Sequence, residues 1–206
     1  MYGFPGCGVA FTEDAVKVGN SSLCLSISKT GPSAYSGGQV ISKNDFSYGL
    51  FTARIKPKLA PGTVGSLFLM NKWTAEQWVH QEIDIEFLGS KPEKVLLSTH
   101  YYVNGVPISH SFEYALGFNA SDSFNEYGIL WERDLVTWYV NGRVAHSEKR
   151  DLPRVGTMNI LMNHWFGDQN NVGFVNWLGP LEEDKFPSSI QYDWIRFSKI
   201  DRDRSS

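Results

Sequence analysis

Three acidic residues at every second position give this sequence its clearest chemical potential: Glu82, Asp84 and Glu86. The positions between and after them are apolar: Ile83, Ile85 and Phe87. Because successive side chains of a strand point to opposite faces, a strand here would gather the carboxylates on one face and the apolar groups on the other. A helix would spread the acids over more than half of its circumference and leave no apolar stripe. The spacing therefore predicts a strand.

Three carboxylates on one strand face suit a site that needs one ionised and one protonated carboxyl group. Like charges at close range raise the pKa of at least one acid, and a purely structural sheet has no reason to accept that. Retaining glycoside hydrolysis has this requirement, since one carboxylate attacks the sugar and a carboxylic acid protonates the leaving oxygen. The alternative interpretations of the spacing are a solvated, acid-rich strand face and a calcium site.

The separation of the two glutamates sets a condition on the shape of this strand. A straight strand would place the Cα atoms of Glu82 and Glu86 about 13 Å apart, at ~3.3 Å per residue. Retaining chemistry brings the two carboxyl groups to within ~5–5.5 Å of each other. We therefore expect a concave sheet on this face, with both side chains leaning toward a common point.

The composition is that of one globular domain without a nucleic-acid or membrane partner. The chain has 206 residues, a net charge of −3 and no run of Lys or Arg, which disfavours binding to nucleic acid or anionic membranes. No apolar stretch approaches the ~18 residues that a membrane span needs. We expect a single domain over residues 1–206 that acts as a monomer.

Short apolar runs separated by turn signals predict an all-β protein. Asn104-Gly105 and Asn141-Gly142 are strong hairpin signals, and no stretch has sustained helical periodicity. We predict a turn at 35–38, an end to one strand at Pro57, and a long loop over 167–189. Strands are predicted at 9–11, 15–18, 22–28, 39–41, 51–56, 64–70, 81–89, 95–102, 106–114, 124–132, 135–140, 143–145, 158–165 and 191–199. This pattern favours an antiparallel β-sandwich of the jelly-roll kind.

Several motifs along the chain resemble one enzyme family. The strongest is Glu82-Ile83-Asp84-Ile85-Glu86-Phe87-Leu88-Gly89. Others are Phe46-Ser47-Tyr48-Gly49-Leu50-Phe51, Tyr101-Tyr102-Val103-Asn104-Gly105, Trp138-Tyr139-Val140-Asn141-Gly142, Met162-Asn163-His164-Trp165, Trp177-Leu178-Gly179 and Tyr192-Asp193-Trp194. In this order and context they resemble glycoside hydrolase family 16, which includes bacterial lichenases (endo-β-1,3-1,4-glucanases), laminarinases and plant xyloglucan endotransglycosylases.

The resemblance implies a concanavalin A-like jelly roll whose concave sheet holds a polysaccharide. It implies Glu82 as the nucleophile, Glu86 as the acid/base and Asp84 as their hydrogen-bonding helper. The motifs are most similar to those of lichenases, which implies a secreted, retaining endo-β-glucanase that hydrolyses β-1,3-1,4-glucan without a catalytic cofactor. The resemblance also implies a structural calcium ion, with Asp193 as its side-chain ligand. The alternatives are a β-1,3-glucanase, a xyloglucan-type endotransglycosylase or hydrolase, and a non-catalytic glycan-binding module.

The sequence departs from the lichenase pattern in places. Gln39 and Ile41 stand where lichenases carry an acidic and a basic substrate-binding residue. Gly37 stands at the place of the second lichenase cysteine, so a disulfide would have to join Cys7 to Cys24. From the residues alone, such a bridge and two separate buried thiols are equally compatible with the sequence.

Aromatic and polar residues near the acidic motif are candidates for contacts with sugar. We expect Trp78 and Trp165 to stack on sugar rings, and Trp177 either to stack or to pack within the protein. We expect His100, Tyr102 and Asn163 to hydrogen-bond sugar hydroxyls, with His80 as a further candidate. The three remaining strand tryptophans, Trp131, Trp138 and Trp194, are predicted to lie in the core.

Overall fold

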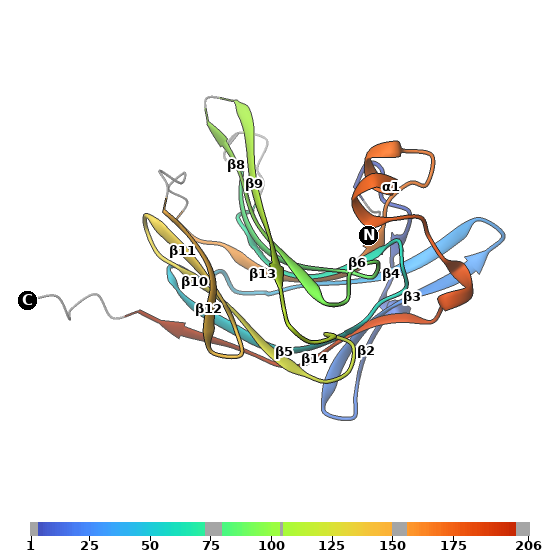
Figure 1. The fold of residues 1–206 in the computed structure, drawn as a ribbon, viewed down its shortest axis with the longest axis horizontal. Coiled ribbons are helices and arrows are strands. Elements are labelled where there is room, and N and C mark those ends of the chain that lie inside the picture. The colour runs from blue at the N-terminus through green and yellow to red at the C-terminus, as the bar shows by residue number, and fades with distance from the viewer. Residues whose placement is uncertain (1–3, 73–79, 104, 150–155, 201–206) are drawn as a thin grey trace, which may run out of the picture.

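The computed structural model describes residues 4–72, 80–103, 105–149 and 156–200. Its strands follow one continuous path of pairing that folds over into two layers, confirming the all-β jelly-roll prediction (Figure 1). The first layer, here called the acidic layer, comprises in spatial order β4 (Ala34–Ile41), β13 (Asn159–Phe166), β6 (Thr63–Met70), β7 (Gln81–Leu88), β8 (Lys94–Val103) and β9 (Val106–Ala115).

The second layer, here called the opposite layer, continues the path beyond β4. It comprises β3 (Ser22–Gly31), β14 (Ser188–Lys199), β5 (Gly49–Lys58), β10 (Asn125–Trp131), β11 (Leu135–Val140) and β12 (Arg143–Lys149). Two short strands lie off the path: β1 (Ala10–Phe11) pairs in parallel with β4, and β2 (Val16–Gly19) pairs with β3. The helical elements are α1 (Val172–Leu178) and the 3-10 turns η1 (Glu13–Ala15) and η2 (Glu183–Lys185).

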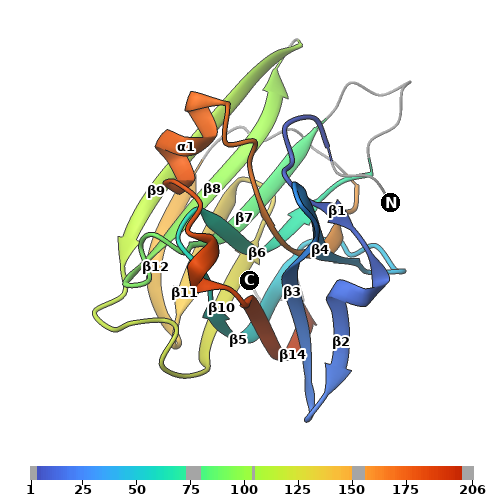
Figure 2. The ribbon, with the colours of Figure 1, turned by 90° about the vertical axis from the view of Figure 1, so that its right-hand side faces the viewer.

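The core lies between the two layers and fixes which face of β7 is outward. Ile83, Ile85 and Phe87 are fully buried, and the Phe87 ring packs edge-on against Tyr127 of β10. Because side chains alternate along a strand, burial of this apolar set turns the three acids to the outer face of the layer. In Figure 1, β8 and β9 rise at one side of that face and α1 stands at the other, so the outer face is curved. Figure 2 shows the molecule from the side of α1, which lies in front of β8 and β9 in that view.

A smaller apolar cluster lies where α1 covers one end of the acidic layer. Trp165 of β13, Val64 of β6 and Leu88 of β7 are buried there, with Leu178 of α1 fully buried beside them. These strand residues share the outer face of the layer with the acids, because they lie in register with one another across β13, β6 and β7. The helix therefore closes this end of the outer face.

The turn predicted at 35–38 is wrong, since these residues lie within β4. The two glycines that suggested it are buried and meet close neighbours. A Cβ atom on Gly37 would lie 2.5 Å from Val9 Cγ2, and one on Gly38 would lie 2.9 Å from the carbonyl oxygen of Ala15. Glycine is thus required here for close approach of the N-terminal segment to the strand, rather than for a turn.

Two other sequence-based boundaries differ from the structure. The loop predicted over 167–189 contains α1, whose N-terminus is capped by the Asn171 side chain accepting from the backbone N–H of Gly173. Seven residues are too few to show helical periodicity in so Gly- and Asn-rich a segment. The strand predicted to end at Pro57 continues to Lys58, with Pro57 paired opposite Ile190 of β14.

The two cysteines are separate thiols. Cys7 pairs with Gly167 beside β13 and its thiol donates to the carbonyl of Val9, whereas Cys24 lies on β3 beside Gln191. Burial raises the pKa of both thiols. No helix in the described part of the chain is long and apolar enough to cross a membrane.

The tryptophans predicted to lie in the core divide into two groups. Trp131 and Trp138 are fully buried, as expected. Trp194 is only half-buried, and the guanidinium of Arg196 lies 4.2 Å from its ring centroid.

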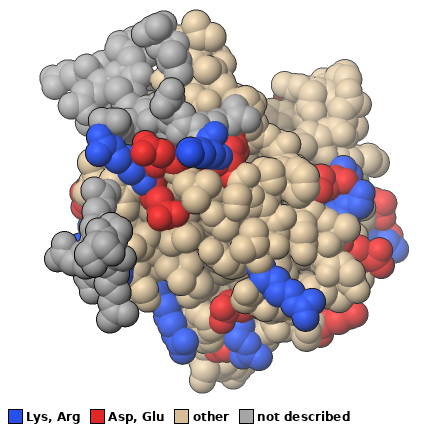
Figure 3. All heavy atoms as spheres, turned by 60° about the vertical axis from the view of Figure 1, so that its left-hand side comes forward, with Lys and Arg blue, Asp and Glu red and all other residues tan. Residues whose placement is uncertain are grey.

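The face drawn in Figure 3 carries acidic and basic side chains side by side rather than a patch of one sign.

Candidate active site

The three acids of β7 occupy the middle of the outer face, each flanked by residues of β6 and β8. Across the ladder, Glu82 lies between Met70 and His100, Asp84 between Phe68 and Ser98, and Glu86 between Ser66 and Leu96. The period-2 alternation that buries the isoleucines thus lines up the carboxyl groups with both apolar and polar neighbours. The structure confirms the predicted common face.

Asp84 is the most buried of the three acids, with 4% of its surface exposed. Burial, and then the charges of Glu82 and Glu86, raise its pKa well above the usual value, and it shares a side-chain hydrogen bond with Glu82. Beside an ionised Glu82, a protonated Asp84 donates that bond. Trp138 reaches through the core from β11 and donates its indole N–H to the main-chain carbonyl of Asp84 at 3.0 Å.

Glu86 and Glu82 have different surroundings although they share one strand face. Burial and the charge of Glu82 raise the pKa of Glu86 to about 8, so its carboxyl group holds a proton at neutral pH. The Oε2 atom of Glu82 lies 3.0 Å from the imidazole Nε2 of His80. The pair therefore supplies one proton-donating acid and one hydrogen-bonded carboxylate, which is the division of roles that retaining glycoside hydrolysis requires.

Two cavities share the acids and together form a trough across the layer. The larger, about 500 Å³, extends over β6, β13 and β4, and the smaller, about 310 Å³, extends over β8 and β9. The larger is lined, besides the acids, by Phe4, Phe11, Gln39, Ile41, Ser66, Phe68, Met70, Leu161, Asn163 and Trp165. The smaller is lined by His80, His100, Tyr101, Tyr102, Pro107, Ile108 and Ser109. One half is thus mainly apolar and the other mainly polar.

Four of the predicted sugar-contacting residues line this trough. His100 and Tyr102 line the polar half, where His100 Nδ1 lies 2.8 Å from the hydroxyl of Ser109. Asn163 and Trp165 line the apolar half. Asn163 accepts a hydrogen bond from Ser66, and Trp165 is only 7% exposed because Phe4 and the α1 residues pack against its ring. Little of the Trp165 ring is therefore exposed to the trough.

One further predicted sugar contact, Trp177, is not part of the trough lining. Trp177 of α1 packs behind Trp165, with ring centroids 5.9 Å apart, and is not among the side chains that line either half. This favours the packing interpretation of Trp177. Trp78 lies outside the described residues.

The sequence-based interpretation missed most of the apolar half of the trough. Phe68, Met70 and Leu161 alternate with core residues on strands that are apolar on both faces, so their outward direction is not visible in the pattern. The ladder supplies the missing signal: once β6 is placed beside β7, Met70 and Phe68 must share the face of Glu82 and Asp84. The contact between His80 and Glu82 was also missed, although both residues were singled out.

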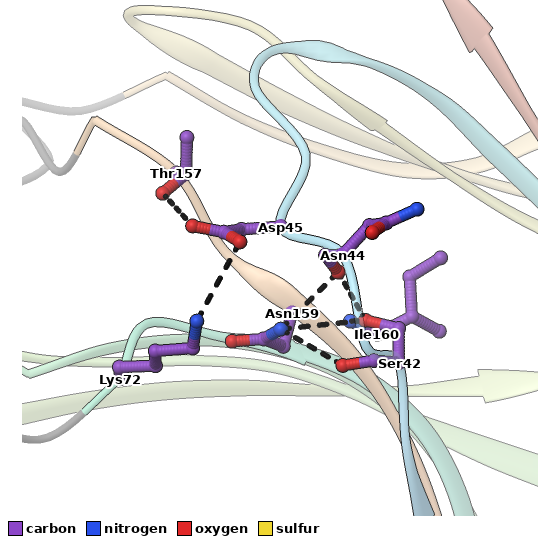
Figure 4. Close-up of polar contacts among 7 residues, drawn as sticks. All are labelled: Ser42, Asn44, Asp45, Lys72, Thr157, Asn159 and Ile160. Atoms are coloured by element: carbon purple, nitrogen blue, oxygen red, sulfur yellow. Dashed lines mark hydrogen bonds and ion pairs between the residues drawn. The ribbon is translucent and has the colours of Figure 1, made fainter.

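Polar contacts hold together three chain segments at one end of the trough (Figure 4). The Asn159 side chain, at the start of β13, donates to the carbonyls of Ser42 and Asn44, which follow β4. Asp45 accepts from Thr157 and pairs with Lys72, which follows β6. Strands β4, β6 and β13 carry the apolar lining, so these contacts fix its width at this end.

Asp193 is engaged with a cation of the protein itself. Its carboxylate accepts from the guanidinium of Arg54 on β5, and it sits at the irregularity in pairing between β14 and β5. Within the described residues, no three His, Cys, Asp or Glu side chains converge as a metal-binding group. A carboxylate already paired with a guanidinium does not fit the hard, oxygen-only coordination of calcium unless Arg54 moves away.

Comparison with known proteins agrees with this geometry. The family model of glycosyl hydrolases family 16 matches residues 6–196. A beta-glucanase of Brevibacillus brevis is 35% identical over 193 residues, covering 92% of this chain and 71% of that protein. A beta-glucanase of Bacillus subtilis is 34% identical, covering 79% of this chain and 63% of that protein.

Solved structures give the same result. The Bacillus licheniformis beta-glucanase superposes with a TM-score of 0.84 at 29% identity, covering 96% of this chain and 88% of that one. A prokaryotic beta-1,3-1,4-glucanase (lichenase) derived from a mouse hindgut metagenome superposes with a TM-score of 0.83 at 30% identity, covering 97% and 91%. By sequence, fold and the acidic motif at its centre, this chain belongs to glycosyl hydrolases family 16.

Proposed function

We propose that this protein is a retaining endo-β-glucanase that hydrolyses β-1,3-1,4-glucan. The observation that carries the proposal is the pairing, in one trough, of Glu86 with a pKa raised to about 8 and Glu82 held as a hydrogen-bonded carboxylate. The most similar relatives are named beta-glucanases, and one structural neighbour is named a beta-1,3-1,4-glucanase. A non-catalytic glycan-binding module would have no use for this pair of carboxyl groups.

In this proposal each glutamate has one role in the first step and Asp84 supports the nucleophile. Glu82 attacks the anomeric carbon while the glycosidic C–O bond breaks and Glu86 gives its proton to the departing oxygen. Water then attacks the anomeric carbon, Glu86 takes a proton from that water, and the ester bond to Glu82 breaks. Two inversions leave the product with the original anomeric configuration. Asp84, by sharing a hydrogen bond with Glu82, holds the nucleophile in place between the steps.

Product analysis on three polysaccharides tests the substrate. Barley β-glucan, laminarin and xyloglucan are each incubated with the protein, and the products are separated by size and linkage. We expect barley β-glucan to yield short oligosaccharides early, as an endo-acting enzyme produces, with the anomeric configuration retained in the first products by NMR. Activity on laminarin alone would indicate the β-1,3-glucanase alternative, and transfer products on xyloglucan would indicate the endotransglycosylase.

We further propose that the protein acts as a secreted, single-domain monomer over residues 1–206. Aromatic side chains line both halves of the trough, which suits binding of a polysaccharide chain. Because β-glucan polysaccharide is found outside the cell, its enzyme would have to be secreted. Light scattering of the purified protein tests the monomer, and activity in the culture medium of the native host tests secretion.

A structural calcium ion at Asp193 stays a prediction, and the Arg54 pairing argues against it. An ion that binds only the folded state raises the melting temperature. Equal melting temperatures in excess calcium and in excess chelator would contradict the calcium site.

A further inference from the structure

His80 lies where it can act on the nucleophile. It directly precedes β7 and continues the row of Glu82, Asp84 and Glu86, because residues two apart share a strand face. The backbone carbonyl of His80 accepts from the N–H of Tyr102, which extends the pairing of β7 with β8 to this residue. Its ring meets the Tyr102 ring edge-on at 5.9 Å. The imidazole is therefore fixed from two sides.

His80 is also the neighbour best suited to donate to Glu82. Its Nε2 lies 3.0 Å from Glu82 Oε2, and an ionised carboxylate only accepts, so the imidazole is the donor. The cross-strand neighbours of Glu82 do not compete for this role. The Met70 side chain has no N–H or O–H to donate. His100 instead bonds the Ser109 hydroxyl through Nδ1, and its Nε2 lies 3.4 Å from Asp84 Oδ2.

We propose that His80 is a positioning residue for the nucleophile, holding the Glu82 carboxylate aimed at the anomeric carbon through its Nε2–H. The inference rests on the proposed glycosidase function and adds to it. One oxygen of Glu82 is held by His80 and the carboxylate is also bonded to Asp84, so the side chain has a single orientation. When the glycosyl–Glu82 ester breaks, the same N–H stabilises the carboxylate that leaves.

Two variants at position 80 separate hydrogen bonding from shape. His80→Gln keeps a neutral N–H donor but cannot become a cation, and His80→Phe keeps a ring against Tyr102 but has no donor. On barley β-glucan, we expect His80→Phe to lose about 10- to 100-fold in kcat, the range for one hydrogen bond to a charged group. We expect His80→Gln to keep kcat within a few-fold of wild type at the optimum. In both variants KM should stay close to the wild-type value, because His80 contacts Glu82 rather than sugar.

The outcomes that overturn the proposal are distinct from failure of the proposed function. If wild type hydrolyses none of the three glucans, the function is wrong. If wild type is active and His80→Phe, folded by its melting temperature, keeps its kcat, the positioning role is wrong. A raised KM with unchanged kcat would overturn it too, because His80 would then contact sugar rather than Glu82.

Discussion

Glu82 and Glu86 share one strand face, and their different surroundings support the roles proposed for them. Glu86 is flanked by Ser66 and Leu96 and keeps its proton, while Glu82 accepts from His80. Sequence spacing alone does not choose between the two, because both project from the same strand in the same direction. The division comes from neighbours that are distant in sequence, and it can be tested at each residue separately.

Azide distinguishes nucleophile from acid/base. With an activated aryl glycoside, Glu86→Ala should still form the glycosyl–enzyme ester, and azide should intercept it to give a β-glycosyl azide. Glu82→Ala has no nucleophile, so azide should enter the vacant space and give the α-glycosyl azide. Both variants should lose at least about 10²-fold in kcat on glucan, since each group acts in the transition state. NMR of the azide products makes the assignment, and the opposite anomers would exchange the two roles.

The alkaline limb of activity should follow Glu86. A general acid works only while protonated, and the pKa of Glu86 is raised to about 8 by burial and by the charge of Glu82. The value of kcat/KM should therefore fall as pH rises through about 8. Rates on soluble barley β-glucan from pH 5 to 10 measure this limb. It should not move in His80→Gln, and an alkaline limb that stays flat to pH 10 would contradict the role of Glu86.

At the scale of elements, β7 is tied to the opposite layer by a buried hydrogen bond. The Trp138 indole N–H reaches the Asp84 carbonyl across the core. A second tie joins the Tyr192 hydroxyl of β14 to the carbonyl of Ser66 on β6 at 2.7 Å. Both hydrogen bonds end on strands that carry trough residues, so the opposite layer helps to position the backbone of β6 and β7 beneath the trough.

Replacing Trp138 by Phe should affect both stability and catalysis. The carbonyl of Asp84 loses its indole donor while the site stays apolar, at a cost of about 1–3 kcal/mol in the free energy of unfolding. We expect kcat to fall more than KM rises, because Asp84 then holds Glu82 less firmly. Trp131→Phe is the matched control, since Trp131 is equally buried but packs on Tyr48, which directly precedes β5. Urea unfolding and kinetics of both variants check this, and equal kinetics in the two would contradict it.

The elements that sequence predicts well are those with one buried and one outward face. Strand β7 is the clearest case, because Ile83 and Ile85 alternate with acids and leave only one way to orient the strand. The pattern fails where both faces are covered. Buried glycines of β4 suggested a turn, and α1 was too short to show its period. The acids were therefore predictable from sequence, whereas the apolar half of the trough required the order of the strands.

At the scale of the whole molecule, a buried histidine at the junction of the two layers makes the stability of the fold sensitive to acid. His164 of β13 is fully buried, with Nδ1 2.8 Å from the Val64 carbonyl and Nε2 2.8 Å from the Ser188 hydroxyl. Ser188 also accepts from the N–H of Ala60 at 2.9 Å. The neutral imidazole thus donates from Nδ1 and accepts at Nε2. Burial lowers its pKa to about 4.

Acid should therefore destabilise the fold through His164. The unfolded chain binds a proton near pH ~6.5 and the folded chain only near 4, so the contribution is complete above about 6.5 and is lost as pH falls toward 4. The loss attributable to this one group is up to about 3 kcal/mol. Urea unfolding at pH 7.5, 6, 5 and 4.5 measures it. His164→Gln, if folded, should show a shallower decline over this range, and an identical slope would assign the acid sensitivity elsewhere.

The position of the last strand has a consequence for how the chain reaches this structure. Strand β14 lies between β3 and β5, and pairs with both. Until residues 188–199 have been synthesised, no strand joins β3 to the β5–β10–β11–β12 sheet within the opposite layer. Assembly therefore waits for β14, whose pairing of Gln191 with Lys56 joins residues more than 130 positions apart in sequence. Such distant pairing makes folding slow. During synthesis the edges of β3 and β5 remain exposed, so this protein should depend on chaperones until β14 has been made.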